Sequence, residues 1–250
     1  MRYFIQLSYS GTNYHGWQKQ PDAMSVQEKI NSAFSTALQT EIDVVGAGRT
    51  DTGVHATKYF AHFDIEFELK DLDQLIFRLN TILPKDIAIQ DIFEVHSESH
   101  ARFDAVSRTY HYFVIQQKDP FLVDNSYYIK NDLDLEKMQE ATKLLFNHKN
   151  FQSFSKVKTD VYTFDCEIYE AFWTDLGNRL QFQIQANRFL RNMVRAIVGT
   201  LIQVGLHKIS VEDFDNIILS QDRRNAGKSV PAHALFLTDI SYPNHIISNL

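Results

Sequence analysis

Residues 46–56 read GAGRTDTGVHA, a stretch that holds three glycines, two threonines, Arg49 and Asp51. Apolar residues at alternate positions flank it at 42–45 and 59–65, which predicts a loop between two strands. A surface loop whose glycines supply positive φ explains these residues as well as a functional site does. A dinucleotide-binding loop is excluded. Its G-x-G-x-x-G spacing requires glycine where Asp51 stands, and a carboxylate there would repel a pyrophosphate.

Outward from this loop, period-two alternation predicts strands and 3.6-residue periodicity predicts helices. In the first half we expect strands at 3–9, 42–45, 59–65 and 87–95, and helices at 26–38, behind a capping box at 25–28, and at 72–79. In the second half we expect strands at 108–115, 164–173, 180–186 and 235–240, and helices at 135–145, 188–204 and 210–219. Two such halves predict an α+β protein with antiparallel sheets, divided into domains 1–105 and 106–250.

The composition is that of an ordinary soluble protein, since 44% of the 250 residues are hydrophobic and 22% are charged. No run approaches the roughly 20 apolar residues of a membrane span, and residues 1–11 lack the apolar block of a signal peptide. Cys166 is the single cysteine, so we expect no internal disulfide and no cysteine-based metal site. The expected location is the cytoplasm.

The charges are unevenly distributed along the chain. Lys and Arg number 25 and Asp and Glu 31, a net charge of −6, whereas nucleic-acid-binding proteins tend to be basic. Two stretches nevertheless contain only basic charges, namely 143–158, with Lys143, Lys149, Lys156 and Lys158, and 176–211, with Arg179, Arg188, Arg191, Arg195 and Lys208. Because phosphates respond to the local field, a surface with separate basic and acidic regions remains compatible with RNA binding.

The stretch GRTDTGVHA closely resembles the active-site signature of the TruA-type tRNA pseudouridine synthases. Further blocks resemble that family in its order along nearly the whole chain: YSGTNYHGWQ at 9–18, AHFD at 61–64, SRTYHY at 107–112, FQSFS at 151–155, NRFLRNMVRAIVG at 187–199 and AGKSVPAHALFL at 226–237. One departure is Thr52, where many members carry Ala or Lys. We expect no chemical consequence from it.

The resemblance implies a pseudouridine synthase fold, with two similar halves flanking a central catalytic cleft. It also implies the isomerisation of uridine to pseudouridine at positions 38, 39 and 40, in the anticodon stem-loop of tRNAs, by a homodimer without any cofactor. In this reaction the N1–C1′ bond breaks, the uracil turns, and it rejoins the sugar through C5. Asp51 would either trap the sugar covalently or remove a 2′ proton, and both routes stay open.

Three further residues receive catalytic roles from the resemblance. Arg49 would help to turn out and hold the target base, although a plain phosphate contact is its simpler interpretation. Tyr110 would stack on the base or deprotonate it, whereas a strand tyrosine alone usually indicates sheet packing. Arg195 would pair with Asp51 and favour the ionised carboxylate that a nucleophile or base requires. Tyr112 lacks such a match and is interpreted as structural.

The remaining candidates are assigned to RNA binding. Arg188, Arg191 and Arg195 fall on one face of the expected helix at 188–204, where a solvated stripe is the alternative, and Arg188 and Arg191 are assigned to phosphates. Ser153, Phe154 and Lys156 either face RNA or, for the aromatic residues, lie in the core. Tyr14, His15 and Trp17 are further RNA-facing candidates. His62 is expected to point outward from its strand.

Two other functions remain open at this point. A non-catalytic RNA-binding paralogue would have lost Asp51, Tyr110 or Arg195, and all three are present. A hydrolytic N-glycosidase would use the same carboxylate at C1′ but admit water in place of C5. Release of free uracil from tRNA distinguishes this glycosidase from an isomerase.

Overall fold

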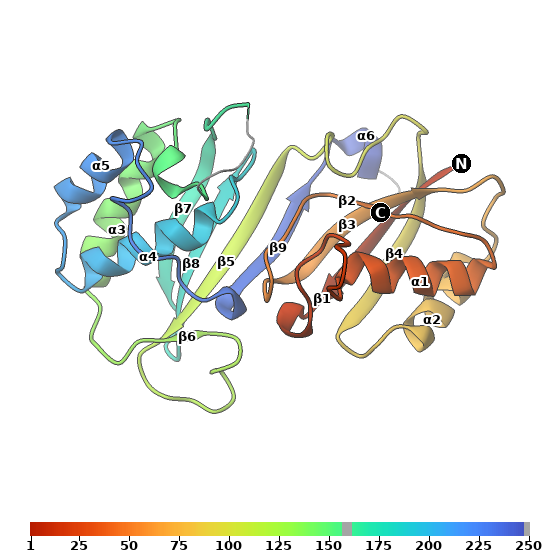
Figure 1. Ribbon diagram of the computed structural model, residues 1–250, viewed down its shortest axis with the longest axis horizontal. Coiled ribbons are helices and arrows are strands. Elements are labelled where there is room, and N and C mark those ends of the chain that lie inside the picture. Colours follow the sequence, from red (N-terminus) through yellow and green to blue (C-terminus); the bar gives the residue numbers. More distant parts are fainter. Residues whose placement is uncertain (157–161, 248–250) are drawn as a thin grey trace. The chain divides into compact units, whose positions relative to one another are not determined.

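The computed structural model describes residues 1–156 and 162–247 (Figure 1). The chain forms two compact units, Met1–Ser107 with Leu237–Leu250, and Arg108–Phe236. The sequence predicted a single boundary near residue 105, whereas the chain returns to the first unit at its end. Tyr242 explains the return, because its ring packs against Phe4 and Phe60 and its hydroxyl donates to the Ala101 carbonyl.

The first unit contains a sheet with strand order β4–β1–β3–β9. Its strands are β1 (Arg2–Tyr9), β3 (His55–Asp64), β4 (Ile87–Val95) and, from Leu237 on, β9 (Leu235–Ser241); the short β2 (Val45–Gly46) pairs with β3. β1 is antiparallel to both neighbours, with Phe4 opposite His62 on one side and Phe93 on the other. The predicted strands at 3–9, 59–65 and 87–95 are confirmed by these pairings, although residues 59–63 of β3 are all buried and do not alternate.

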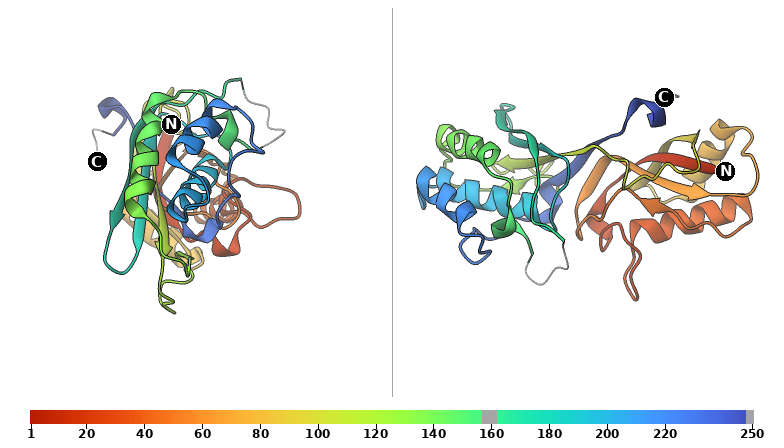
Figure 2. Two further views of the ribbon diagram at one scale, coloured as in Figure 1. Left: turned by 90° about the vertical axis from the view of Figure 1, so that its left-hand side faces the viewer. Right: turned by 90° about the horizontal axis from the view of Figure 1, so that it is seen from above.

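Helices α1 (Val26–Leu38) and α2 (Leu72–Ile82) cover one face of this sheet (Figure 2). The Ser25 half of the predicted capping box is confirmed, because the Ser25 side chain accepts from the Glu28 amide, whereas the described residues show no return bond to the Glu28 carboxylate. Phe34 on α1 is fully buried and its ring centroid lies 5.0 Å from that of Phe63 on β3. This face of the unit is therefore an aromatic core beneath the strand that leads out of the 46–56 loop.

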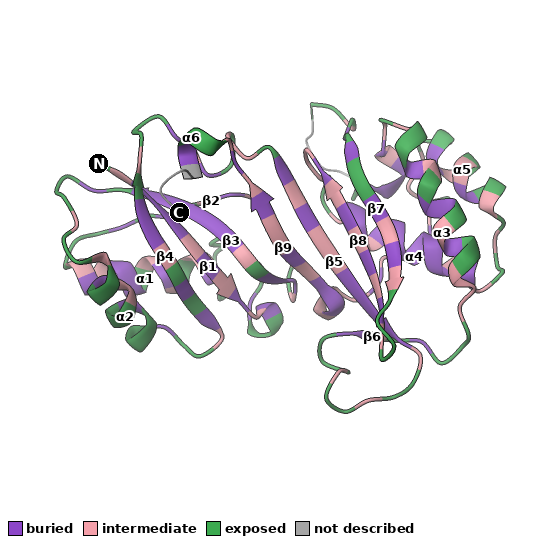
Figure 3. Ribbon diagram, turned by 180° about the vertical axis from the view of Figure 1, so that it is seen from behind, coloured by how far each residue is buried: buried purple, intermediate pink, exposed green. Residues whose placement is uncertain are grey.

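The second unit contains a sheet with strand order β5–β8–β7. Its strands are β5 (Ser107–Ile115), β7 (Ile168–Asp175) and β8 (Leu180–Ala186), and β6 (Tyr127–Tyr128) pairs in parallel with β5. Its helices are α3 (Leu135–Lys143), α4 (Met193–Gly205) and α5 (Val211–Leu219). Figure 3 shows α4 buried along most of its length, whereas α3 and α5 alternate between buried and exposed residues.

The shorter elements complete the description. They are the 3₁₀ helices η1 (Gly11–Asn13), η2 (Leu144–Asn147), η3 (Gln152–Phe154) and η4 (Ala232–Ala234), and a last turn of helix, α6 (Asn244–Ile247). Within the described part of the chain, no helix has the length and hydrophobicity needed to span a membrane.

Candidate active site

The start of the 46–56 loop is hydrogen-bonded to β3, the strand that follows the loop. The Ala47 amide donates to the Phe60 carbonyl over 2.9 Å, and the Gly48 amide donates to the Tyr59 hydroxyl over 3.2 Å. The Tyr59 hydroxyl in turn donates to the Gly48 carbonyl. Gly46 has no space for a side chain, since a Cβ would lie 2.3 Å from Trp17 Nε1. Packing therefore requires glycine at this position.

Asp51 begins a tight turn. The Val54 amide donates to the Asp51 carbonyl over 3.1 Å, and Gly53 has a φ of +80°. A type II turn requires positive φ at its third residue, which glycine adopts without a steric cost. The turn exposes Thr52 and leaves Asp51 half-buried.

The 9–18 segment packs against this turn and is hydrogen-bonded to it. Tyr9 and Thr50 are joined through their hydroxyls at 2.9 Å, and the Gly53 amide donates to the Tyr14 carbonyl over 3.3 Å. The backbones also approach closely, because a Cβ on Gly16 would lie 2.2 Å from the Thr50 carbonyl oxygen. A Cβ on Gly11 would lie 2.0 Å from the Val54 carbonyl oxygen. The segment YSGTNYHGWQ thus acts as the support of the Asp51 loop.

The prediction that Tyr14 faces RNA is wrong, and Trp17 is also buried except where it borders a pocket beside Arg49. Both side chains are buried, with 3% of their surface exposed, while His15 is exposed. The Tyr14 hydroxyl donates to Asp86, and burial together with this bond raises the pKa of the Tyr14 hydroxyl. The Trp17 ring packs on the Tyr59 ring with 4.1 Å between centroids.

Two buried histidines accept hydrogen bonds from backbone amides. His55 Nδ1 accepts from the Gly11 amide over 3.1 Å, and His62 Nδ1 accepts from the Ala101 amide over 3.2 Å. The predicted outward orientation of His62 is wrong, because this side chain is 3% exposed. Burial, with the positive charge of Arg2 and the nearby His100, lowers the pKa of His62 to about 4. The neutral ring is therefore the form that accepts the amide.

In the second unit, Tyr110 lies on β5 opposite Ile184 of β8. Its ring is half-buried and meets the Phe189 ring edge to face, with 5.1 Å between centroids. Tyr112, two residues further on, is fully buried and its hydroxyl donates to the Pro231 carbonyl over 3.0 Å. Burial raises the pKa of the Tyr112 hydroxyl, and its structural interpretation is confirmed.

Arg195 lies in the first turn of α4 and is half-buried. Its Nε donates to the Val230 carbonyl over 2.7 Å, and the Val230 amide donates to the Arg195 carbonyl over 3.2 Å. The 226–237 block also packs closely on α4 at Gly199, where a Cβ would lie 2.0 Å from the Lys228 carbonyl oxygen. Two of the blocks that resemble the family therefore pack together and orient the Arg195 guanidinium.

The predicted basic stripe on a helix at 188–204 is wrong, because α4 begins at Met193. Asn192 has a φ of +69°, a left-handed conformation that stops the helix from extending toward Arg188. Arg188 Nη1 instead donates to the Thr163 carbonyl over 3.4 Å. Arg191 is exposed in the turn before α4.

Lys156 and Arg191 lie next to each other, since the Lys156 amide donates to the Arg191 carbonyl over 3.0 Å. Both side chains are exposed. Lys158, which the sequence placed in the same basic stretch, lies outside the described residues. In the preceding block, Ser153 and Phe154 are fully buried, and the Ser153 hydroxyl donates to the Ile217 carbonyl over 2.7 Å, so the core alternative is confirmed there.

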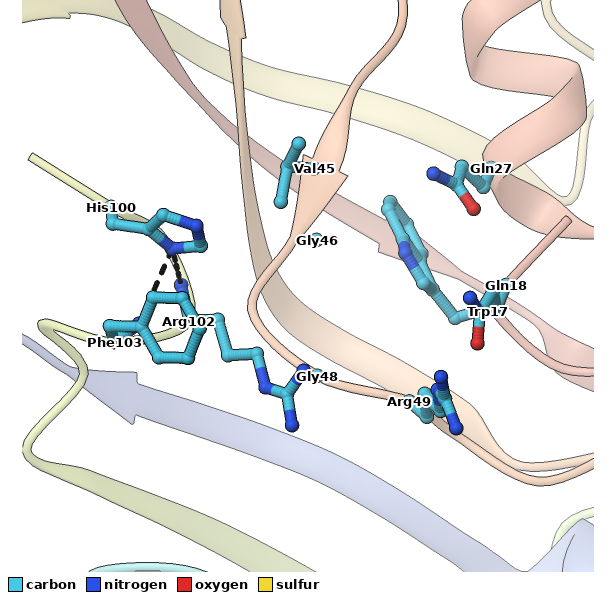
Figure 4. Close-up of a pocket in the computed structure, with 10 residues that line it drawn as sticks. All are labelled: Trp17, Gln18, Gln27, Val45, Gly46, Gly48, Arg49, His100, Arg102 and Phe103. Atoms are coloured by element: carbon cyan, nitrogen blue, oxygen red, sulfur yellow. Dashed lines mark hydrogen bonds between the residues drawn. The ribbon is translucent and has the colours of Figure 1, made fainter.

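The two units divide the candidate residues between them. Arg49 and Asp51 belong to the first unit, and Tyr110, Arg195, Arg188, Arg191 and Lys156 to the second. The pairing of Asp51 with Arg195 stays a prediction. A pocket beside Arg49 is lined by Arg102 and Phe103, neither of which the sequence singled out (Figure 4). In the sequence, these two residues stood out only as a basic residue followed by an aromatic residue between two predicted strands.

Comparison with known proteins gives the same family as the separated sequence blocks. A sequence model of the family described as tRNA pseudouridine synthase matches residues 6–104 and 141–243. The chain belongs to the tRNA pseudouridine synthase family. Its relatives include proteins named tRNA pseudouridine synthase A from Parabacteroides distasonis, 52% identical over 98% of this chain and 97% of theirs, and from Bacteroides fragilis, 51% identical over 98% of both. The protein of that name from Bacillus subtilis is 37% identical over 98% of this chain and 100% of its own.

Proposed function

We propose that this chain isomerises uridine to pseudouridine at positions 38, 39 and 40 in the anticodon stem-loop of tRNAs. The observation that carries the proposal is the Asp51 loop. Its carboxylate is half-buried on a type II turn that the 9–18 segment supports from below. A reacting group gains most when its position is fixed before the substrate arrives. The match to relatives named for this activity, over nearly their full length, agrees with it.

The reaction exchanges one bond for another within the same nucleotide. The N1–C1′ bond breaks, the uracil rotates, a C5–C1′ bond forms, and the C5 proton leaves while N1 gains a proton. Asp51 acts on the sugar, either as a nucleophile at C1′ or as the base for a 2′ proton, and the two routes stay open. No oxidant, reductant or group donor enters this balance, so we expect no cofactor and no metal.

Arg49 is the residue we assign to the displaced base or its phosphate. It is exposed, two residues before Asp51, and makes no hydrogen bond or ion pair with any residue that the structure describes. The target uridine must leave the stack to reach Asp51. A guanidinium without an internal partner loses no protein contact when it takes the place of the base or holds a phosphate.

Tyr110 and Arg195 complete the proposed catalytic set. The edge-to-face contact with Phe189 fixes the Tyr110 ring, which stacks on the target base or takes the C5 proton with its hydroxyl. Arg195, oriented by the Val230 carbonyl, pairs with Asp51 and keeps it ionised. Lys156, Arg191 and Arg188 bind phosphates of the stem-loop. We further propose that a homodimer in the cytoplasm carries out the reaction, with one tRNA contacting both subunits.

The test is incubation of the purified protein with an unmodified tRNA transcript in the presence of EDTA. Pseudouridines are then mapped by carbodiimide treatment and reverse transcription. Stops at positions 38 to 40 support the proposal, and an activity that only added metal restores contradicts the mechanism. Free uracil in the supernatant would identify a glycosidase, and intact uridine despite tight binding would identify a non-catalytic RNA-binding protein.

A further inference from the structure

A pocket of about 210 Å³ opens beside the Asp51 loop, within the first unit (Figure 4). On one side it is lined by Trp17, Gly46, Gly48 and Arg49 of the loop and its support. On the other side it is lined by Arg102 and Phe103, which follow β4 in the 99–104 loop. Of the residues given a role in the proposed reaction, Arg49 lines this pocket, whereas Asp51, Tyr110 and Arg195 do not.

The lining combines positive charge with exposed aromatic surface. Arg49 and Arg102 supply two guanidinium groups, and no Asp or Glu is among the lining residues. Phe103 is 73% exposed, so its aromatic surface is available to a ligand at the pocket. The Trp17 indole N–H, which also borders the pocket, has no acceptor among the described residues. Such a lining suits a ligand with a phosphate, a flat ring and a hydrogen-bond acceptor.

The pocket is formed before any ligand binds, because its outer loop is fixed. His100 Nδ1 accepts from the Arg102 amide over 3.1 Å, and the His100 amide donates to Asp104 over 2.7 Å. The Ala101 amide is held by the buried His62. Binding therefore loses little free energy to ordering of this loop.

We propose that this pocket binds an unpaired nucleotide of the RNA substrate next to the target uridine. Its base stacks on Phe103 with an edge toward the Trp17 N–H, and its phosphate lies between Arg49 and Arg102. The volume supports one flat base, because pockets for drug-sized ligands measure about 300–1,000 Å³. This inference rests on the proposed function. It adds a second nucleotide-binding position, which holds the neighbour of the target while that uridine is displaced.

The first test separates recognition from catalysis. We expect Phe103→Ala to raise the KM for unmodified tRNA by about tenfold, because a base–aromatic stack contributes roughly 1–3 kcal/mol, a factor of about 5 to 150. Arg102→Gln should also raise the KM, because it removes a charge that holds the phosphate. The value of kcat should stay within twofold of the wild type. Phe103→Tyr, which keeps the aromatic face, should restore the wild-type KM.

A matched control comes from α2, where Phe77 and Arg78 form another exposed pair of the same two residue types. Phe77 is 74% exposed, close to the value for Phe103. Phe77→Ala and Arg78→Gln should leave KM unchanged. An equal KM in the Phe103, Arg102 and α2 variants would overturn the pocket proposal while leaving the isomerase intact. A wild-type protein that makes no pseudouridine would instead overturn the proposed function.

The second test observes the pocket directly. Trp17 and Trp173 are the two tryptophans of the chain, and the buried Trp173 Nε1 has no partner among the described residues. Trp173→Phe therefore breaks no hydrogen bond and leaves Trp17 as the single indole reporter. Titration with a uridine trinucleotide should change the Trp17 emission, and Phe103→Ala should weaken that response. No response, or an equal response to inorganic polyphosphate, would overturn recognition of a base.

Discussion

At the residue scale, the geometry of Asp51 depends on neighbours that do no chemistry. Gly53 supplies the positive φ of the turn, and the Tyr9 hydroxyl meets Thr50 just before the carboxylate. The sequence identified Asp51, Arg49 and Tyr110 only through the resemblance to a family, since loops with Arg and Asp are common. The sequence could not show how the Asp51 loop is held in place, because the contacts that hold it come from the distant 9–18 segment.

Tyr110→Phe separates two roles of one ring. The variant keeps the aromatic face and the contact with Phe189 but lacks the hydroxyl that would take the C5 proton. We expect tRNA binding within a few-fold of the wild type and a loss of pseudouridine yield of at least tenfold in a single-turnover assay. Tyr169→Phe, at an exposed site on β7, is the control. A normal rate would show that Tyr110 acts through its ring alone.

His62 makes the stability of the protein dependent on pH. Its folded-state pKa of about 4 lies below the ordinary value of 6.5, so the unfolded state binds more protons between these values. The free energy of unfolding should therefore decrease as the pH falls from about 6.5 toward 4. His62→Gln, whose amide oxygen can still accept from the Ala101 amide, should show a smaller decrease in urea midpoint between pH 7 and pH 5. An identical decrease would assign the effect to other groups.

At the element scale, most strands and helices follow from periodicity, because half-buried strands and amphipathic helices leave a regular pattern. The start of α4 was missed for a physical reason. Three arginines recur at helical spacing, at Arg188, Arg191 and Arg195. Asn192 adopts a left-handed conformation that prevents a helix across this stretch, and a single such residue leaves no trace in the periodicity. The return of β9 to the first unit was also missed, since strand pairing over such a separation is not visible in local sequence.

The support of the Asp51 loop by the 9–18 segment can be tested at Gly16. Gly16→Ala strains a backbone with φ of +87° and places a Cβ 2.2 Å from the Thr50 carbonyl oxygen. We expect the loop to shift and kcat to fall at least tenfold, because small displacements of a reacting group are costly. Gly177→Ala has a similar φ of +83° but open space around its Cβ, so it reports the strain alone. Equal activity in both variants would contradict the supporting role.

At the scale of the whole molecule, the net charge of −6 conceals local basic regions. The structure brings Lys156 and Arg191 together through a backbone hydrogen bond although they are distant in sequence. The α+β class and the family were predictable from the sequence, because several separated blocks match in order. The support of one block by another, and the pocket beside Arg49, became visible only in the folded chain.

The basic pair should appear in the salt dependence of tRNA binding. If both side chains contact phosphates, the double variant Lys156→Gln/Arg191→Gln should reduce the slope of log K against log salt by about 0.7–0.9 per lost contact. Lys70→Gln/Lys85→Gln, which removes two exposed charges from the first unit, should leave the slope unchanged. Equal slopes in both double variants would place Lys156 and Arg191 away from the RNA.

Asp51→Asn shows whether this carboxylate performs the chemistry. The substitution keeps the shape of the side chain but removes its charge and its nucleophilic oxygen, whereas tRNA binding depends on many phosphate and stacking contacts. Asp51→Glu should fail as well, because one extra methylene displaces the oxygens by more than ~1 Å. The measurement is pseudouridine yield on unmodified tRNA beside a binding isotherm. We expect no detectable product, with an affinity for tRNA within a few-fold of the wild type. Turnover of Asp51→Asn at even a tenth of the wild-type rate would contradict this role.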